Sequence, residues 1–305
     1  MAGWNTSDIS SQSGRSAVIT GTGGLGFQSA LALARAGAHV IIAGRKPSKG
    51  NHAVAQIRQS VPDASVRFEL LDLASLESVA AFGARLRAER DSIDLLINNA
   101  AVMTPPKRQV TSDGFELQLG TNYLGHFALT AHLLPLLRKG KNPRVVTVSS
   151  IAARNGAINF EDLQAEHRYR ALAVYSQSKL ACLMFSYELQ RQSDAAAWGL
   201  ASIGAHPGLS RTDLVANGAG WFSAFGVIRL LFAKILFQSA SQGALPTLYA
   251  ATSPNVGPGT YHGPDTFNEM RGAPTIAKPP LQALDTNVAK RLWEVSGKLT
   301  GARFE

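Results

Sequence analysis

Short apolar runs alternate with amphipathic stretches along most of this chain. The runs at residues 16–20, 39–43 and 144–148 are rich in aliphatic residues and have few polar interruptions. Such runs are typical of parallel strands that are buried on both faces. The stretches between them space their apolar residues as a helix does, for example at 27–36, which Gly37 ends. The pattern predicts an α/β fold, a doubly wound parallel sheet with helices on both faces.

The alternation continues to the carboxyl end. We expect a helix at 239–251, a turn with a short strand at 257–264, and an amphipathic helix at 285–299 whose first residue is the N-cap. No repeat, linker or low-complexity segment argues for a second domain, so residues 16–305 are assigned to a single domain. Residues 1–15 are polar, lack the signature of a leader peptide, and are expected to form a loose arm.

Composition narrows the class of protein. The 305 residues are 45% hydrophobic, which is enough for one large core. The net charge is +9, but there is no basic run with interleaved aromatic residues, so we expect no nucleic-acid partner. The single cysteine, Cys182, forms no internal disulfide, and a reducing cytoplasmic location is expected. The seven histidines form no metal-ligand pattern, so no metal is expected.

A glycine-rich turn joins the first apolar run to the helix that follows it. The residues of this turn that we assign to cofactor binding are Gly21, Gly23, Gly24, Leu25 and Gly26. Glycines let the backbone approach a pyrophosphate, whose charge is received by the amides and the dipole of the helix start. This strand, turn and helix predict a Rossmann-type dinucleotide site.

Arg45 and Lys46 follow the second predicted strand. An NAD site usually offers a carboxylate there for the ribose 2′-hydroxyl, whereas an NADP site offers an arginine for the 2′-phosphate. No acidic residue occurs between Asp8 and Asp63. The cations of that stretch are Arg15, Arg35, Arg45, Lys46, Lys49 and Arg58. A solvated basic face is the alternative, but we predict NADP(H) in preference to NAD(H), with Arg45 and Lys46 in the site.

Tyr175 and Lys179 lie four residues apart in a stretch with helical spacing, so their side chains share one face. An ammonium about 4 Å from a phenol, at an effective dielectric of about 20, supplies roughly the 4 kcal/mol that lowers a tyrosine pKa from about 10 to about 7. A chance pair on a helix surface is the alternative. Ser150 follows the strand at 144–148, where a hydroxyl can hydrogen-bond a substrate oxygen. With Asn122, these residues suit proton transfer to a carbinol oxygen.

Seven motifs in this order resemble the short-chain dehydrogenases/reductases, and within them the retinol-dehydrogenase-like branch. The motifs lie at residues 20–26, 71–73, 98–100, 121–127, 148–150, 175–179 and 206–212. The resemblance implies an NADP-dependent oxidoreductase that transfers a hydride between nicotinamide and a lipophilic carbonyl or alcohol substrate. Because NADP favours reduction in a cell, we expect carbonyl reduction.

The resemblance also implies roles for individual residues. Tyr175 is the general acid/base, Lys179 holds the nicotinamide ribose and lowers the tyrosine pKa, and Ser150 orients the substrate oxygen. Asn122 would bind a water that links Lys179 to solvent. The remaining cofactor residues implied are Asp72 with Leu73 at the adenine, Asn99 and Ala100 along the adenosine ribose, and Pro207, Gly208, Leu209 and Thr212 at the nicotinamide carboxamide. For Asp72, an N-cap near the helix that starts around Leu76 is an equal alternative.

The chain departs from the family pattern in three places. The glycine turn at 20–26 is one residue shorter than usual. Ala101 stands where the family has a glycine, which asks it to take a conformation that glycine takes more easily. Ser150 and Tyr175 are 25 positions apart, as in the retinol-dehydrogenase-like branch, and the longer segment around 159–170 is expected to border the active site.

Residues 213–238 are expected to form a variable substrate lid. Its apolar stretch at 221–237 is interrupted by Arg229 and Lys234 and falls short of the roughly 20 apolar residues that a membrane span needs. Such a lid predicts a lipophilic substrate, while a core helix and a peripheral membrane contact are the alternatives. A homodimer through the helix that carries Tyr175 is left open as well.

A noncatalytic dinucleotide-sensing regulatory protein is the alternative function. A sensor needs only the cofactor half of the fold, so the intact set of Ser150, Tyr175 and Lys179 favours an enzyme.

Overall fold

The computed structural model of this chain describes residues 3–210 and 237–305. Its strands are β1 (Ser16–Thr20), β2 (His39–Gly44), β3 (Val66–Leu70), β4 (Leu95–Asn98), β5 (Arg144–Val148), β6 (Ala201–Ala205), β7 (Tyr261–Thr266) and β8 (Arg271–Ile276). Its longer helices are α1 (Gly24–Arg35), α2 (Pro47–Ser60), α3 (Leu76–Glu89), α5 (Gly125–Leu137), α6 (Ala171–Ala195), α10 (Leu245–Thr252) and α11 (Thr286–Thr300). Its shorter helical turns are η1 (Thr6–Asp8), α4 (Leu117–Leu119), η2 (Gly120–Leu124), η3 (Ile151–Asn155), η4 (Phe160–Asp162), α9 (Ala240–Gly243) and η6 (Leu281–Leu284).

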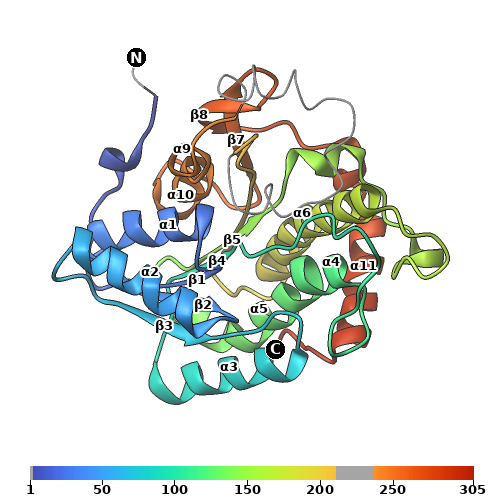
Figure 1. The fold of residues 1–305 in the computed structure, drawn as a ribbon, viewed down its shortest axis with the longest axis horizontal. Helices are drawn as coiled ribbons and strands as arrows, with labels where there is room; N and C mark the ends of the chain where they lie inside the picture. The colour runs from blue at the N-terminus through green and yellow to red at the C-terminus, as the bar shows by residue number, and fades with distance from the viewer. Residues whose placement is uncertain (1–2, 211–236) are drawn as a thin grey trace.

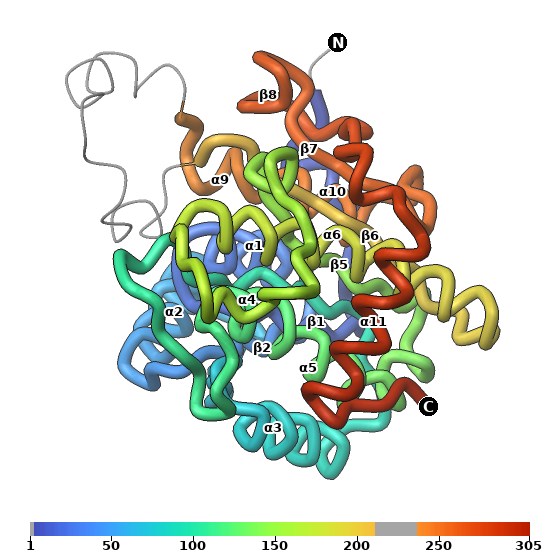
Figure 2. The backbone as a smooth tube through the Cα atoms, turned by 90° about the vertical axis from the view of Figure 1, so that its right-hand side faces the viewer, coloured from blue at the N-terminus to red at the C-terminus, as the bar shows by residue number. Residues whose placement is uncertain are grey.

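One eight-stranded sheet runs through the described residues in the order β3-β2-β1-β4-β5-β6-β7-β8 (Figure 1). Strands β1 to β7 are parallel, and β8 is antiparallel to β7. Helices α1, α2 and α10 cover one face, and α3, α5 and α6 cover the other. Figure 2 shows α11 on the outside of the second group, where it contacts α6. The predicted doubly wound α/β fold is confirmed.

Successive residues of a strand pack into the two hydrophobic cores on opposite faces of the sheet. In β1, Val18 belongs to the core under α3, α5 and α6, whereas Ala17 and Ile19 belong to the core under α1, α2 and α10. All three side chains are fully buried. Because a strand alternates its side chains across the sheet, both faces demand apolar residues. This explains why the predicted strands read as almost continuous apolar runs.

The carboxyl-terminal elements follow the sequence pattern with one correction. Helix α11 begins after Asp285, whose Oδ1 accepts hydrogen bonds from the amides of Asn287 and Val288, each at 3.0 Å. The helix predicted at 239–251 is present but is interrupted at Ala244, so that α9 ends at Gly243 and α10 starts at Leu245. Pro246 stands in the first turn of α10, where a residue without an amide hydrogen is tolerated.

The amino-terminal segment is anchored, in place of the loose arm that was predicted. The ring of Trp4 packs edge-on against Tyr249 of α10, with the centroids 5.2 Å apart. Gln12 is buried, and its amide donates to the carbonyl oxygen of Ala36 at 2.7 Å. These contacts hold residues 4–15 against the end of α1 and against α10.

Two predictions fall outside the described residues. The first is the cofactor role of Thr212. The second is the substrate lid at 213–238, of which the structure describes only residues 237 and 238. In the part of the chain that the structure does describe, no helix combines the length and the hydropathy that crossing a membrane requires.

Candidate active site

The glycine turn lies at the carboxyl end of β1. Gly21 and Gly24 have φ values of +97° and +52°, a left-handed backbone that favours glycine. A Cβ at Gly26 would come 2.5 Å from the carbonyl oxygen of Gly21, so α1 packs directly on the turn. Gly23 is the N-cap of α1, and the helix start therefore faces the turn as an anion site requires. The described residue Ala101 does not have a positive φ, so the backbone strain predicted there is absent.

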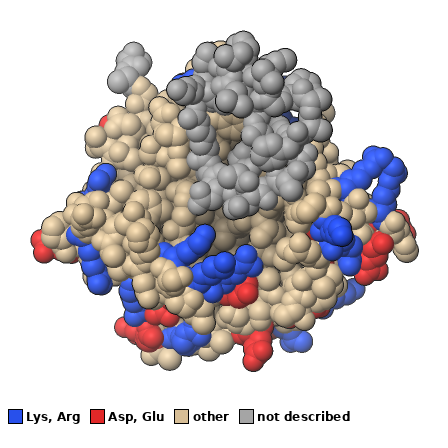
Figure 3. Space-filling model, in the orientation of Figure 1, with Lys and Arg blue, Asp and Glu red and all other residues tan. Residues whose placement is uncertain are grey.

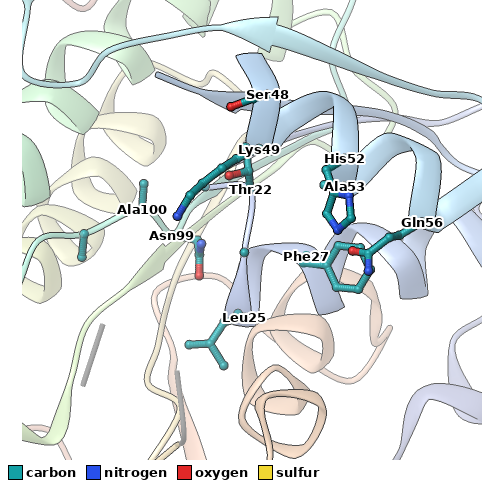
Figure 4. A pocket seen from close by; sticks show the side chains of 14 residues that line it. Thr22, Leu25, Phe27, Ser48, Lys49, His52, Ala53, Gln56, Asn99 and Ala100 are labelled. Carbon is teal, nitrogen blue, oxygen red and sulfur yellow. The ribbon is translucent and has the colours of Figure 1, made fainter. Parts of the chain in front are cut away.

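Two cavities open at this turn. The first has a volume of about 770 Å³ and lies at the starts of α1 and α2 (Figure 4). The predicted cofactor residues that line it are Gly21, Gly23, Gly24, Leu25, Asn99 and Ala100. The second has a volume of about 340 Å³, and the predicted residues that line it are Gly21, Arg45, Lys46, Asp72, Leu73 and Ala100. The structure thus brings together the residues predicted for the pyrophosphate and adenosine side, while Gly26 is buried beneath the turn.

Lys49 is a cavity residue to which sequence reasoning gave no role. It lies in the first turn of α2 and lines both cavities. Figure 4 shows its amine reaching toward Asn99 and Ala100. The available signal was its place in the acid-free stretch, three positions after Lys46. Other lining residues that were missed are Thr22, Ser48, His52, Gln56 and Thr121.

The second cavity has a positive lining. Arg45, Lys46 and Lys49 contribute three cations, and Asp72 contributes the one carboxylate among the lining residues described. Lys and Arg side chains also gather near the centre of the face that Figure 3 shows. A cavity of this charge attracts a phosphate more strongly than a neutral hydroxyl.

Asp72 does not cap α3. The N-cap is Ser75, whose hydroxyl accepts from the amide of Ser78 at 3.2 Å. Asp72 instead accepts from the amide of Ala74 at 2.9 Å, and so shapes the loop after β3. The N-cap alternative for Asp72 is therefore wrong, and its contact with adenine stays a prediction.

Ser150, Tyr175 and Lys179 meet at the carboxyl end of β5. Tyr175 and Lys179 lie one turn apart on α6, and only 6% and 3% of their surfaces are exposed. The Ser150 side chain lies close enough to the phenol to lower its pKa. The Lys179 ammonium donates to the carbonyl oxygen of Val148 at 2.9 Å. None of the three lines the two cavities described above.

The pKa of Tyr175 departs from the sequence-based expectation. Burial raises this pKa to about 12, and the nearby Ser150 side chain opposes the rise. Lys179 is not among the groups that shift it, and burial lowers the pKa of Lys179 itself. The predicted lowering of the Tyr175 pKa is therefore wrong for this structure, because loss of hydration disfavours the phenolate. At neutral pH the phenol is protonated, as a proton donor must be.

Asn122 lies in the π-helical turn η2 and is fully buried. Its Oδ1 accepts from the amide of Val102 at 2.7 Å, and its Nδ2 donates to the carbonyl oxygen of Val102 at 3.0 Å. The same Nδ2 donates to Ser178, the residue before Lys179, at 3.0 Å. The amide thus ties the loop after β4 to α6. Its predicted link to solvent through a water stays a prediction.

The loop after β6 contains three residues predicted at the carboxamide. Gly208 has φ +62°, and a Cβ there would lie 2.3 Å from the carbonyl oxygen of Met270. The amide of Leu209 donates to that same oxygen at 2.7 Å. The carbonyl oxygen of Pro207 accepts from Gln238 at 2.7 Å. This loop is fixed against the turn between β7 and β8, and it lines neither of the two cavities.

The longer segment before Tyr175 is joined to both of its neighbours. Within it, the Tyr169 hydroxyl donates to the carbonyl oxygen of Pro105 at 2.8 Å. The amide of Asn159 donates to Gln177 of α6 at 2.9 Å. The segment at 159–170 therefore bridges α6 and the loop after β4.

Comparison with known proteins defines the class. The family model for short chain dehydrogenases matches residues 15–221, and the chain belongs to this family. Polyprenol dehydrogenase of Mus musculus is 39% identical over 297 residues, which cover 95% of this chain and 85% of the relative. Retinol dehydrogenase 13 of Mus musculus is 39% identical over 294 residues, which cover 94% and 84%. The solved structure of an uncharacterized protein from Mycobacterium paratuberculosis has a TM-score of 0.83 and 39% identity, and the match covers 100% of both chains.

These relatives place the chain in the retinol-dehydrogenase-like branch, as predicted. It is an NAD(P)-dependent dehydrogenase/reductase that acts on CH–OH or C=O groups.

Proposed function

We propose that this chain is an NADP(H)-dependent oxidoreductase that interconverts a lipophilic carbonyl compound and its alcohol, with Tyr175 as general acid/base. The observation that carries the proposal is the burial of Tyr175 and Lys179 one turn apart on α6, with Ser150 beside the phenol at the carboxyl end of β5. Burial raises the pKa of the phenol to about 12, so at neutral pH the phenol holds the proton that carbonyl reduction requires.

Each residue of the set has a distinct part in the proton step. Ser150 donates a hydrogen bond that orients the carbonyl oxygen, and Tyr175 delivers its proton to that oxygen as negative charge develops on it. Lys179 is buried one turn further along α6, where it would hold the nicotinamide ribose. The nicotinamide supplies the hydride when it is bound.

The cavity residues fit NADP(H). Gly21 and Gly24 supply the left-handed turn at the start of α1 that a pyrophosphate needs. Arg45, Lys46 and Lys49 supply the positive lining that favours a 2′-phosphate. The preference for NADP(H) over NAD(H) rests on these three cations.

The substrate class rests on the relatives. Two of them are named for polyprenol and retinol, which are both lipophilic alcohols. We therefore expect a hydrophobic aldehyde or ketone to be the substrate in the reducing direction.

The test is turnover by the purified chain. NADPH is mixed with a panel of hydrophobic aldehydes and ketones, and loss of the reduced-nicotinamide absorbance is followed. Tyr175→Phe is expected to lower kcat by about 10²-fold to 10⁴-fold with NADPH affinity retained. Tyr249→Phe, which removes a hydroxyl on α10, is the matched control and should keep full activity.

Two outcomes would contradict the proposal. Equal turnover by the wild-type chain and Tyr175→Phe would remove the proton-transfer role. NADPH binding without turnover of any compound in the panel would favour the noncatalytic sensor.

A further inference from the structure

His126 occupies an interior position between the glycine turn and helix α6, which carries Tyr175 and Lys179. It lies in the first turn of α5 and is 2% exposed. Its Nε2 is 2.8 Å from the hydroxyl oxygen of Thr20, the last residue of β1. Its Nδ1 is 2.9 Å from the carbonyl oxygen of Asn122. One imidazole therefore contacts the strand that leads into the glycine turn and the π-helical turn that carries Asn122.

The partners determine the direction of each hydrogen bond. A carbonyl oxygen only accepts, so the proton of the neutral ring must be on Nδ1 and point to Asn122. Nε2 then has a free lone pair and accepts the hydroxyl proton of Thr20. The carbonyl oxygen of Ile97, at 3.4 Å, is the more distant acceptor for that proton.

The hydroxyl oxygen of Thr20 then has both lone pairs available. It accepts from the amide of Asn99 and from the amide of Ala100, each at 2.9 Å. Asn99 and Ala100 line the 770 Å³ cavity. The Thr20 hydroxyl thus donates one hydrogen bond to His126 and accepts two, so it has no unused donor or acceptor. The imidazole fixes the orientation of this hydroxyl.

The Asn122 side of the ring leads to the catalytic helix. The carbonyl oxygen of Asn122 accepts a hydrogen bond from Nδ1, and it also accepts one from the thiol of Cys182 on α6 at 3.1 Å. Asn122 itself donates to Ser178, next to Lys179. His126 is thus two hydrogen bonds away from the cavity wall and two away from α6.

We propose that His126, as the neutral tautomer protonated on Nδ1, is a positioning residue that sets the Asn99–Ala100 wall of the cofactor cavity through Thr20. The ring touches neither substrate nor cofactor in this role. A ring that cannot accept at Nε2 leaves the Thr20 hydroxyl free to rotate, and the two amides it holds lose their fixed acceptor. This proposal rests on the proposed function where it names NADPH as the ligand that responds.

Two variants separate the two sides of the ring. In His126→Gln the side-chain carbonyl reaches the Nε2 position and keeps an acceptor for Thr20. In His126→Asn the shorter amide reaches the Nδ1 position, keeps a donor to Asn122, and leaves Thr20 without its acceptor. We expect NADPH Kd to stay within about 3-fold of wild type in the Gln variant and to rise about 10-fold in the Asn variant.

His132→Gln is the matched control, because His132 lies on the same helix outside this network and should leave Kd unchanged. Equal losses of affinity in the Gln and Asn variants would overturn the proposal. So would thermal destabilisation of both variants with unchanged Kd, which is the signature of a purely structural residue.

The tautomer has a test that does not depend on activity. Nitrogen-15 NMR of the imidazole at neutral pH should show a protonated Nδ1 and an unprotonated Nε2 for His126. A proton on Nε2 would overturn the proposal even in an active enzyme. A wild-type chain that binds NADPH without turnover would instead count against the proposed function and leave the Kd comparison intact.

Discussion

The Nε2 of His206 lies 3.0 Å from a carboxylate oxygen of Glu269, which joins the loop after β6 to the turn between β7 and β8. The same oxygen pairs with Arg154 at 2.6 Å, four positions after Ser150. Burial alone would raise the pKa of Glu269, but hydrogen bonds from His206 and the Lys278 amide, with the charge of Arg154, lower it to about 2. One carboxylate therefore holds together two loops that flank the proposed catalytic residues.

The turn that presents Glu269 is strained. Phe267, Asn268 and Glu269 have φ values of +51°, +54° and +65°. Left-handed non-glycine residues cost about 1–3 kcal/mol each and persist only where their surroundings hold them. The ion pair with Arg154 and the hydrogen bond with His206 are contacts of that kind.

Glu269→Gln should weaken this junction. A neutral amide has no negative charge to pair with the Arg154 guanidinium. We therefore expect a loss of about 1–3 kcal/mol in the free energy of unfolding, or about 5 °C in Tm. Thermal unfolding followed by circular dichroism measures the change. Glu305→Gln removes a pair with Arg303 in which the side chains are 78% and 85% exposed, and serves as the control with almost no change in Tm. Equal shifts in both variants would show that the junction adds nothing.

Lys49→Ala should discriminate between the two cofactors. The lysine lines both cavities, and under the proposed function its loss would remove a charge-assisted hydrogen bond to the 2′-phosphate. We expect NADPH Kd to rise about 10-fold and NADH Kd to change less than about 2-fold. Fluorescence titration gives both constants. Lys298→Ala, in the last turn of α11, is the control. Similar losses for NADPH and NADH would argue against the phosphate role.

Gly26→Ala should distort the glycine turn. The added methyl group would meet the carbonyl oxygen of Gly21 at 2.5 Å and the Nδ2 of Asn99 at 2.7 Å, so the turn or α1 must move. We expect a loss of about 1–3 kcal/mol in stability and a clear loss of NADPH affinity. Gly297→Ala in α11, where a Cβ meets nothing closer than 3.7 Å, should raise stability by about 0.5–1 kcal/mol. Denaturant unfolding and titration with NADPH test both variants.

Stability should fall in acid partly through His126. Burial lowers its pKa to about 4, the hydrogen bond to the Asn122 carbonyl opposes this, and the charge of Lys179 adds to the lowering. Since the unfolded chain binds a proton at about pH 6.5, the contribution of the neutral ring is complete above that pH. It is lost as the pH falls from about 6.5 through 4. Urea unfolding over this range should give a steeper decline for wild type than for His126→Gln, and parallel curves would contradict the assignment.

Much of the fold could be predicted because its signals are local. Strands β1, β2 and β5 followed from apolar runs that a sheet covered on both faces demands. Gly21 and Gly24 followed from their place between a strand and a helix, and both take positive φ. The break between α9 and α10 was missed, since the helical pattern there continues across Gly243.

The site was harder to predict where it depends on contacts between distant segments. Glu269 lies 115 residues from Arg154 and has no neighbour in the sequence that suggests the contact. Thr20 and His126 are 106 residues apart, and neither spacing nor residue type pairs them. Lys49 was counted as a charge, but its place in both cavities follows from how α2 packs beside the glycine turn.

The sequence by itself determined the doubly wound sheet, the dinucleotide turn and the family, because periodicity, glycine positions and ordered motifs are read along the chain. Only the tertiary structure decided the loss of hydration around Tyr175 and the hydrogen-bond partners of His126 and Asn122. Those properties depend on how much water is excluded and on which atoms face one another after folding. Desolvation raised the pKa of Tyr175 to about 12, where its spacing from Lys179 had predicted the opposite.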